Sequence, residues 1–279
     1  MHIYTDLDGI TKHLKSEIIR GKAIGFVPTM GALHAGHLSL LKKGLETCEL
    51  MVVSIFVNPT QFNNPEDLEN YPRTIEQDLE MLKKASCDIV FLPDVKTIYP
   101  DHYKDIDINI SPIDQIMEGK YRPGHFHGVL NVVYRFFEII QPNKAFFGRK
   151  DLQQVAIVKK MVKTLGLPIE VVACDTLRQE NGLAMSSRNA RLTDKQKEEA
   201  SAIYKTLVFG KKLAKLYSPA ETLTFMLDYF NHFDLKLEYL EIIDSTTFLP
   251  LTDYWVSGAS ACIAAYSGEV RLIDNMELS

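Results

Sequence analysis

Several features that would mark other classes of protein are missing from this chain. Its four cysteines, Cys48, Cys87, Cys174 and Cys262, are widely spaced, with no Cys-x-x-Cys pair and no histidine at ligand spacing. We therefore expect reduced thiols in the interior rather than disulfides or a zinc site, as is typical of a reducing compartment. No apolar run approaches the roughly 20 residues of a membrane span, and the first residues lack a signal-type apolar core. The sequence thus predicts a cytoplasmic protein without a membrane partner.

Positive charge is in short supply as well. The chain has 31 lysines and arginines against 36 aspartates and glutamates, a net charge of −5. A general nucleic-acid-binding protein needs a basic surface to offset phosphate, so we expect no nucleic-acid partner. A few local cations are enough for a phosphate pocket, and that kind of site is not excluded. With 46% hydrophobic residues over 279 positions, the chain has the composition of a globular protein and room for two domains.

The first two-thirds of the chain alternate short apolar runs with amphipathic stretches. Residues 50–57 (LMVVSIFV) are almost continuously apolar, which is typical of a parallel strand covered on both faces. We predict strands at residues 23–29, 50–57, 88–92, 144–147 and 169–174, with helices between them at residues 33–48, 74–85, 126–140 and 151–165. Alternation of this kind predicts βαβ units, and therefore an α/β fold with a Rossmann-like parallel sheet and helices on both faces.

The pattern changes near Arg178. A polar segment (RQENGLAMSSRNAR) leads to Thr193, which with Gln196 three residues later forms a capping box for a helix. We predict helices at residues 194–216 and 219–232, and then strands at residues 235–243, 259–266 and 270–273 without helices between them. We therefore expect two domains, a Rossmann-like domain at residues 1–178 and a smaller α+β domain at residues 179–279.

The segment that indicates chemistry most strongly is residues 28–38 (PTMGALHAGHL). A strand ends at Thr29, Gly31 permits a tight turn, and a helix begins near His34. In parallel sheets, ligands bind beyond the carboxyl ends of the strands, where helix N-termini offer N–H groups to phosphate. His34 and His37 are three residues apart and so share one face of a helix. The segment therefore predicts a phosphate-binding site.

Other interpretations of this segment fit less well. Gly31 and Gly36 have the spacing of a P-loop, but His37 and Leu38 stand where a P-loop has Lys and Ser or Thr. No Gly-x-Gly-x-x-Gly fingerprint of a dinucleotide fold is present. A lone histidine is more often an ordinary core or surface residue, but two histidines flanking a glycine directly after a strand favour a ligand. A metal pair is disfavoured because no carboxylate or third histidine lies at ligand spacing, so we expect no protein-bound metal.

The sequence His34-Ala-Gly-His37 resembles the His-x-Gly-His motif of the nucleotidyltransferase superfamily, and residues 28–38 as a whole resemble the signature of pantothenate synthetases within it. Further segments agree with that family in order and spacing: FVNPTQF at 56–62, YPR at 71–73, RPGHF at 122–126, FGRKDLQQ at 147–154 and GLAMSSRN at 182–189, with RLIDN at 271–275 as a looser match. The chain departs from the pattern at Arg149, where the family often has Glu.

The resemblance implies an ATP-dependent carbon–nitrogen ligase that joins pantoate to β-alanine. The pantoate carboxylate would attack the α-phosphorus of ATP and release pyrophosphate, and the amine of β-alanine would then displace AMP from pantoyl-adenylate to give pantothenate, a coenzyme A precursor. Mg²⁺ would accompany ATP, held largely by phosphate oxygens and water. Residues 1–178 would bind ATP and pantoate, residues 179–279 would act as a lid, and the family implies a homodimer.

The resemblance also implies which residues contact ATP. A cation such as Lys150 at a helix start opposes the helix dipole, a conflict that a bound anion would remove. Paired hydroxyls followed by an arginine suit phosphate oxygens. The residues expected to stabilise charge on the phosphates are His34, His37, Lys150, Ser186, Ser187 and Arg188. Those expected to line the nucleotide in addition are Met30, Gly31, Ala32, Leu33, Ala35, Gly36, Gly148, Arg149, Asp151, Leu177 and Met185.

A third group is expected to bind pantoate: Asn58, Gln61 and Gln154. Neutral amides can orient a carboxylate and hydroxyls without quenching the nucleophile. One of the adjacent Gln153 and Gln154 is expected to face solvent, and the resemblance points to Gln154 as the substrate-binding one.

Two other functions share the phosphate motifs: a nucleotidyltransferase without a ligation step, and a non-catalytic nucleotide-binding module. Neither has a need for the glutamines.

Overall fold

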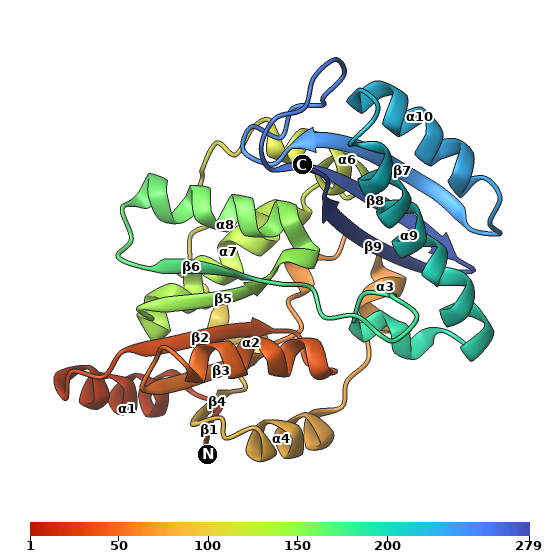
Figure 1. The fold of residues 1–279 in the computed structure, drawn as a ribbon. Helices are drawn as coiled ribbons and strands as arrows, with labels where there is room; N and C mark the ends of the chain where they lie inside the picture. The colour runs from red at the N-terminus through yellow and green to blue at the C-terminus, as the bar shows by residue number, and fades with distance from the viewer. The chain divides into compact units, whose positions relative to one another are not determined.

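In the computed structural model, which describes residues 1–279, the chain divides into two units (Figure 1). The N-terminal unit comprises Met1–Arg149 and Gln153–Asp175, and the C-terminal unit comprises Lys150–Leu152 and Thr176–Ser279. The division at Asp175 lies close to the domain boundary predicted after residue 178. The assignment of Lys150–Leu152 to the C-terminal unit differs from the prediction, which places this segment in the domain at residues 1–178.

A six-stranded parallel sheet forms the centre of the N-terminal unit. Its strands are β1 (His2–Tyr4), β2 (Ile24–Thr29), β3 (Leu50–Ile55), β4 (Ile89–Phe91), β5 (Lys144–Gly148) and β6 (Glu170–Cys174), in the spatial order β1-β4-β3-β2-β5-β6. From β2 the chain adds β3 and β4 on one side, and it later adds β5 and β6 on the other. The carboxyl ends of β2 and β5 therefore flank the switch point, where open parallel sheets bind ligands.

Helices cover both faces of this sheet, because alternate residues of a strand point to opposite sides. On one face, Val27 packs with Leu41 of α2 and Leu82 of α4. On the other, the ring of Phe26 lies 5.5 Å from that of Phe136 in α7. The longer helices that begin in or cross this unit are α1 (Leu7–Ile19), α2 (Ala35–Leu45), α4 (Ile75–Lys84), α7 (His125–Ile140) and α8 (Leu152–Leu165).

Short helices fill the connections between these elements. They are the α-helices α3 (Pro65–Glu69), α5 (Val95–Ile98) and α6 (Met117–Tyr121), and the 3₁₀ helices η1 (Pro59–Gln61), η2 (Ile113–Gln115) and η3 (Arg149–Asp151). None of the helices in the chain combines the length and the apolar character that crossing a membrane requires.

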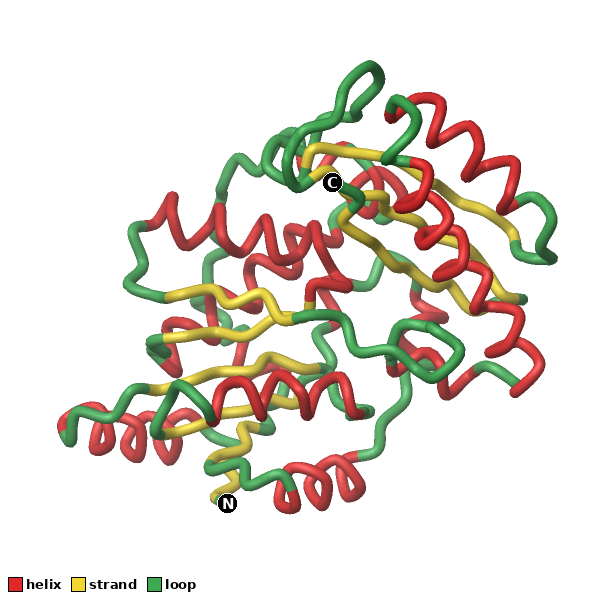
Figure 2. Tube along the Cα trace, viewed as in Figure 1, coloured by secondary structure: helices red, strands yellow, loops and turns green.

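The C-terminal unit is built on a three-stranded antiparallel sheet. Its strands β7 (Lys236–Asp244), β8 (Ala259–Ser267) and β9 (Val270–Glu277) have β8 in the middle, and α9 (Asp194–Leu213) and α10 (Pro219–Phe230) are its long helices (Figure 2). Leu207 of α9, Met226 of α10 and Ile263 of β8 share one core. The predicted capping box of Thr193 and Gln196 begins α9. The α/β fold class with a smaller α+β part is thus confirmed.

The cysteines are all free, as expected. Cys48, Cys87 and Cys262 are buried, and Cys174 is partly buried. Burial raises the pKa of the Cys87 thiol to about 12. A thiol with so high a pKa stays protonated at neutral pH and is a poor nucleophile, which is typical of a structural cysteine.

Candidate active site

The loop between β2 and α2 carries the first group of predicted residues, Met30–His37. Gly31 and Ala32 both have positive φ angles, 81° and 48°, which turn the chain sharply after the strand. The buried carboxylate of Asp78 in α4 accepts hydrogen bonds from the backbone N–H of Ala32 at 2.9 Å and of Leu33 at 2.7 Å. The hydroxyl of Thr74 donates to the same carboxylate at 3.1 Å. Asp78 therefore sets the shape of this loop.

His34 and His37 lie against each other at the start of α2. Their ring centroids are 4.0 Å apart, which confirms that they share one face. His34 is the N-cap, and its Nδ1 accepts from the backbone N–H of Gly36 at 3.1 Å; Nδ1 of His37 accepts from the backbone N–H of His34 at 3.3 Å. Because each Nδ1 accepts, each neutral ring carries its proton on Nε2. Both rings are therefore set up as Nε2–H donors at a helix N-terminus, which suits an anion.

Asn58 and Gln61 lie beyond the carboxyl end of β3, in and before η1. Asn58 is 1% exposed, and its Nδ2 donates to Oε1 of Gln61 at 3.2 Å and to the carbonyl of Gly128 at 3.1 Å. Its Oδ1 accepts from the hydroxyls of Tyr99 and Thr60, both at 3.0 Å. Both the nitrogen and the oxygen of the Asn58 amide thus form hydrogen bonds to other groups of the protein, and one of its N–H groups orients Gln61.

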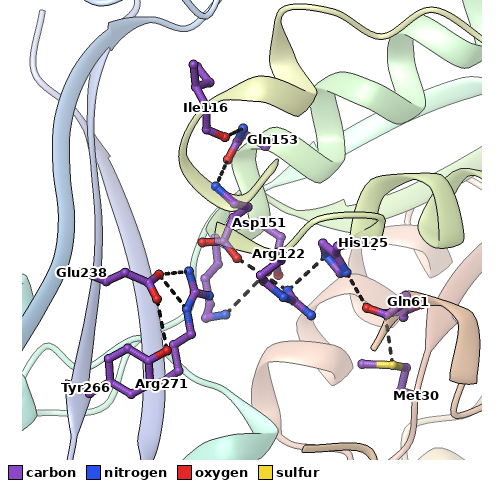
Figure 3. A network of polar contacts seen from close by, with 12 residues as sticks. Met30, Gln61, Ile116, Arg122, His125, Asp151, Gln153, Glu238, Tyr266 and Arg271 are labelled. Atoms are coloured by element: carbon purple, nitrogen blue, oxygen red, sulfur yellow. Dashed lines mark hydrogen bonds and ion pairs between the residues drawn. The ribbon is translucent and has the colours of Figure 1, made fainter. Parts of the chain in front are cut away.

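The amide of Gln61 is turned toward the β2–α2 loop. Its Oε1 accepts from Asn58, so its Nε2 points the other way and donates to the sulfur of Met30 at 3.2 Å (Figure 3). A thioether is a weak acceptor. A carboxylate or hydroxyl would bind the same N–H groups more strongly, so Gln61 is suited to a polar substrate.

The two glutamines of α8 differ from expectation. Gln153 is buried, with 4% of its surface exposed, and its Oε1 accepts from the backbone N–H of Glu118 at 2.9 Å. Its Nε2 donates to the carbonyl of Ile113 at 2.8 Å. The same Nε2 donates to the carbonyl of Ile116 at 3.0 Å (Figure 3). Gln154 is partly buried. Gln153, the glutamine left to face solvent when Gln154 is assigned to the substrate, is therefore buried instead, and it joins η2 and α6 to α8 through three hydrogen bonds.

Around the end of β5 the predicted residues divide between the units. Gly148 and Arg149 belong to the N-terminal unit, and a guanidinium nitrogen of Arg149 lies 3.7 Å from Asp175. Lys150 and Asp151 belong to the C-terminal unit, with Nζ of Lys150 at 3.7 Å from the Asp151 carboxylate. The backbone carbonyl of Lys150 accepts from Nδ2 of Asn275 at 2.8 Å. Asn275 thus fixes the chain at Lys150.

The Met185–Arg188 segment precedes and enters the 3₁₀ helix η4 (Ser187–Arg191) of the C-terminal unit. Ser186 is the N-cap, and its hydroxyl accepts from the backbone N–H of Arg188 at 3.3 Å. The backbone N–H of Met185 donates to the carbonyl of Leu177 at 2.9 Å. These contacts form a small polar turn whose hydroxyl and guanidinium groups are the ones predicted to bind phosphate.

Arg178 anchors the start of this segment. Its guanidinium pairs with the buried carboxylate of Asp274, with Nη2 at 3.0 Å from Oδ1, and lies 4.6 Å from the ring centre of Tyr204. It also donates to the carbonyl of Gly182 at 3.1 Å. Asp274 belongs to the RLIDN segment, so this looser motif has a structural role in holding residues 178–182.

The predicted residues therefore form two groups. In the N-terminal unit, Met30–His37, Asn58, Gln61, Gly148, Arg149 and Gln154 follow the carboxyl ends of the neighbouring strands β2, β3 and β5. In the C-terminal unit lie Lys150, Asp151, Leu177, Met185, Ser186, Ser187 and Arg188. No group of three or more His, Cys, Asp or Glu side chains in residues 1–279 has metal-binding geometry.

Sequence reasoning missed Asp78 and His125 as parts of this region. Asp78 stands in a predicted helix among other acidic residues, and its partners lie 45 and 46 residues away. His125 is in the RPGHF segment, but its partner Gln61 is 64 residues away. The RPGHF resemblance was the one available signal, and it points to the segment without naming a role.

Comparison with known proteins gives consistent matches over the whole chain. A model of the pantoate–β-alanine ligase family matches residues 2–277. The pantothenate synthetase of Cytophaga hutchinsonii is 46% identical over 276 residues, which cover 98% of this chain and 97% of that protein. The pantothenate synthetase of Christiangramia forsetii is 48% identical over 263 residues, 93% of each chain.

Solved structures agree with the sequence matches. The crystal structure of pantothenate synthetase from Thermus thermophilus has a TM-score of 0.94 and 39% identity, and the match covers 100% of this chain and 99% of that one. The pantoate–β-alanine ligase of Francisella tularensis, complexed with beta-gamma ATP and β-alanine, has a TM-score of 0.84 and 38% identity, with 100% and 98% covered.

Proposed function

We propose that this chain, which belongs to the pantoate–β-alanine ligase family, condenses pantoate with β-alanine through a pantoyl-adenylate. The reaction releases pyrophosphate and AMP. The observation that carries the proposal is the pair of Nε2–H donors that His34 and His37 hold at the N-terminus of α2. The Francisella tularensis relative, solved with beta-gamma ATP and β-alanine, supports ATP and β-alanine as two of the substrates.

The chemistry explains why ATP is required. A carboxylate is a poor acyl donor because an oxide would have to leave. In the first step, a pantoate carboxylate oxygen bonds to the α-phosphorus of ATP while the bond to the β-phosphate oxygen breaks, and pyrophosphate departs. In the second step, the β-alanine amine bonds to the acyl carbon, AMP leaves with the former carboxylate oxygen, and the nitrogen loses a proton.

Charge stabilisation is the main task of the protein in the first step. Phosphoryl transfer depends on positioning and on neutralising charge more than on covalent help. His34 and His37 would donate from Nε2 to phosphate oxygens. Lys150, Ser186, Ser187 and Arg188 of the C-terminal unit would add cations and hydroxyl donors, and the other predicted nucleotide contacts would line the base and sugar. No general base is needed, because the attacking carboxylate is already ionised.

Pantoate would be oriented by Gln61 and Gln154. The N–H groups of Gln61, now turned to the Met30 sulfur, are donors for a carboxylate or hydroxyl. The amide of Asn58 forms hydrogen bonds with Gln61, Gly128, Tyr99 and Thr60. Asn58 would therefore act on pantoate indirectly, by orienting Gln61. Orientation by neutral groups leaves the nucleophile its charge.

Three further parts of the proposal follow from the family. Mg²⁺ would enter with ATP, held by phosphate oxygens and water, and would supply charge neutralisation. The C-terminal unit would serve as a lid that protects the adenylate from water. The protein would be a homodimer in the cytoplasm.

Exchange of labelled pyrophosphate into ATP tests the adenylation step directly. With pantoate present and β-alanine absent, we expect exchange, and we expect none without pantoate. His37→Ala and Lys150→Ala should each lower the exchange rate by about 100-fold or more, with unchanged circular dichroism. Exchange without any acid would favour a nucleotidyltransferase, and ATP binding without exchange would favour a binding module. Near-normal exchange in either variant would remove that residue from the mechanism.

A further inference from the structure

The first turn of α7 lies directly behind the loop that carries Gln61, and the proposed reaction gives it no role. Its first residue, His125, is 6% exposed. Nδ1 of His125 lies 2.8 Å from the backbone carbonyl of Gln61, and Nε2 lies 3.0 Å from a guanidinium nitrogen of Arg122 (Figure 3). Both ring nitrogens thus have partners in the N-terminal unit.

The partners define the protonation of the ring. A carbonyl can only accept a hydrogen bond and a guanidinium can only donate one. Nδ1 of His125 therefore carries the proton and donates to Gln61, whereas Nε2 accepts from Arg122. The Glu118 carboxylate, 3.5 Å from the same guanidinium, helps to hold Arg122 in place. His125 is thus a neutral, one-proton link between this ion pair and the backbone of Gln61.

Backbone packing holds the same loop from a second point. A Cβ on Gly128, one turn further along α7, would lie 2.5 Å from the carbonyl oxygen of Thr60 and 2.7 Å from the backbone nitrogen of Gln61. The carbonyl of Gly128 also accepts from Nδ2 of Asn58. The helix therefore contacts η1 without an intervening side chain, and a small rotation of the Gln61 peptide would change these distances.

We propose that His125 is a positioning residue for pantoate binding, because its Nδ1–H fixes the Gln61 peptide and with it the direction of the Gln61 amide. Without this donor, a buried carbonyl would lose its partner, and the peptide would turn to find another. The Gln61 amide would then leave the arrangement set by Asn58 and Met30. This inference rests on the proposed role of Gln61 in binding pantoate.

Two substitutions separate the functions of the two ring nitrogens. In His125→Asn, the side-chain amide places an N–H where Nδ1 stood, so the hydrogen bond to Gln61 is kept. In His125→Gln, the amide reaches the position of Nε2 instead, and the contact with Arg122 is kept.

The Asn variant should retain the KM for pantoate within about threefold. The Gln and Ala variants should raise the KM for pantoate about tenfold or more, which is the effect of one lost buried hydrogen bond. The KM for ATP should stay within about twofold in all three, since an ATP site built on α2 keeps its contacts.

A nearby histidine supplies the control. His127 lies two residues along the same helix, but its side chain is 60% exposed and its Nε2 contacts Asp105 at 2.9 Å. His127→Ala should leave both KM values unchanged. Each variant is assayed by AMP formation, with pantoate and ATP titrated separately, and its thermal unfolding is measured.

The outcomes distinguish the inference from the proposed function. Wild-type protein without pantoate-dependent turnover, or Gln61→Ala with an unchanged KM for pantoate, would contradict the proposed function. If Gln61→Ala is impaired but His125→Gln and His125→Ala bind pantoate normally, only the inference is wrong. It is also wrong if a folded His125→Asn fails as badly as His125→Ala. Rescue by Asn and not by Gln supports it, because general damage to the fold would not select the δ position.

Discussion

A single buried carboxylate decides the conformation of the loop that carries the histidines. Asp78 is 1% exposed and accepts from two consecutive backbone N–H groups, those of Ala32 and Leu33. A carboxylate that accepts from backbone donors makes a strong, charge-assisted contact. The positive φ angles of Gly31 and Ala32 place these two N–H groups on the same side of the loop. The turn and the carboxylate therefore depend on each other.

Removal of this carboxylate should affect both stability and nucleotide binding. Asp78→Ala leaves two N–H groups without their acceptor, and we expect a loss of about 2 kcal/mol in the free energy of unfolding. We also expect the KM for ATP to rise about tenfold, since the His34–His37 helix start follows the loop. Urea denaturation and ATP titration measure the two effects.

A residue on the same helix serves as the control for Asp78. Glu76 is exposed on α4, and Glu76→Gln should change neither quantity. Asp78→Ala with normal stability and a normal KM for ATP would show that the loop holds its shape without the carboxylate.

At the residue scale, prediction from sequence succeeded where the signal is local. His34 and His37 flank a glycine after a strand, and their pairing follows from a three-residue spacing. Asp78 and Gln153 depend on backbone groups 45 and 35 residues away, so nothing in their own neighbourhoods distinguishes them. Gln153 shows the consequence, because its burial was not predicted.

At the scale of elements, apolar runs and caps predicted most of the fold. Strands β2 to β6 are each found within a few residues of their predicted ranges, and the signal is clearest in β3 and β4, whose residues are all buried. Strand β1, with only three residues and two of them exposed, has no such run. Strand β9 continues to Glu277 rather than ending at residue 273, because Arg178 pairs with Asp274 and allows a carboxylate to be buried in the strand.

The two long helices of the C-terminal unit begin with matched capping boxes that differ in one charge. Thr193 pairs with the neutral Gln196, and Ser218 pairs with the ionisable Glu221. Hydrogen bonds from the hydroxyl and backbone N–H of Ser218 lower the pKa of Glu221 below its ordinary value of 4.5. A group with a depressed pKa stabilises the fold fully above its unfolded pKa, and loses that contribution as the pH falls through the folded pKa.

The two caps should therefore respond differently to acid. Glu221→Gln should lower the free energy of unfolding at neutral pH, and the difference from wild type should shrink as the pH falls below 4.5. Thr193→Ala should cost about 1 kcal/mol at every pH, because its partner does not titrate. Urea denaturation over a pH series measures both. A pH-independent effect of Glu221→Gln would show that its ionisation contributes nothing to the cap.

At the scale of the whole molecule, the proposed phosphate contacts belong to both units. The chain leaves the N-terminal unit after Arg149, contributes Lys150–Leu152 to the C-terminal unit and returns at Gln153. The Met185–Arg188 turn is held to the C-terminal unit through its anchor at Arg178. Apolar periodicity predicts each unit separately. It says nothing about which catalytic residues act together, so the combined action of the two groups needs a functional test.

A double-mutant cycle between the units provides that test. If His37 and Arg188 stabilise charge on the same triphosphate in one transition state, removal of one side chain also removes part of the stabilisation that the other side chain provides. His37→Ala and Arg188→Ala should each lower pyrophosphate exchange by about 100-fold. The double variant should then lose far less than the roughly 10,000-fold product of two independent effects. Lys212, exposed on α9, supplies the reference, and Lys212→Ala should combine with His37→Ala without coupling. A full product for His37 and Arg188 would mean that the two residues contribute independently to adenylate formation, and their joint action on one triphosphate would then be wrong.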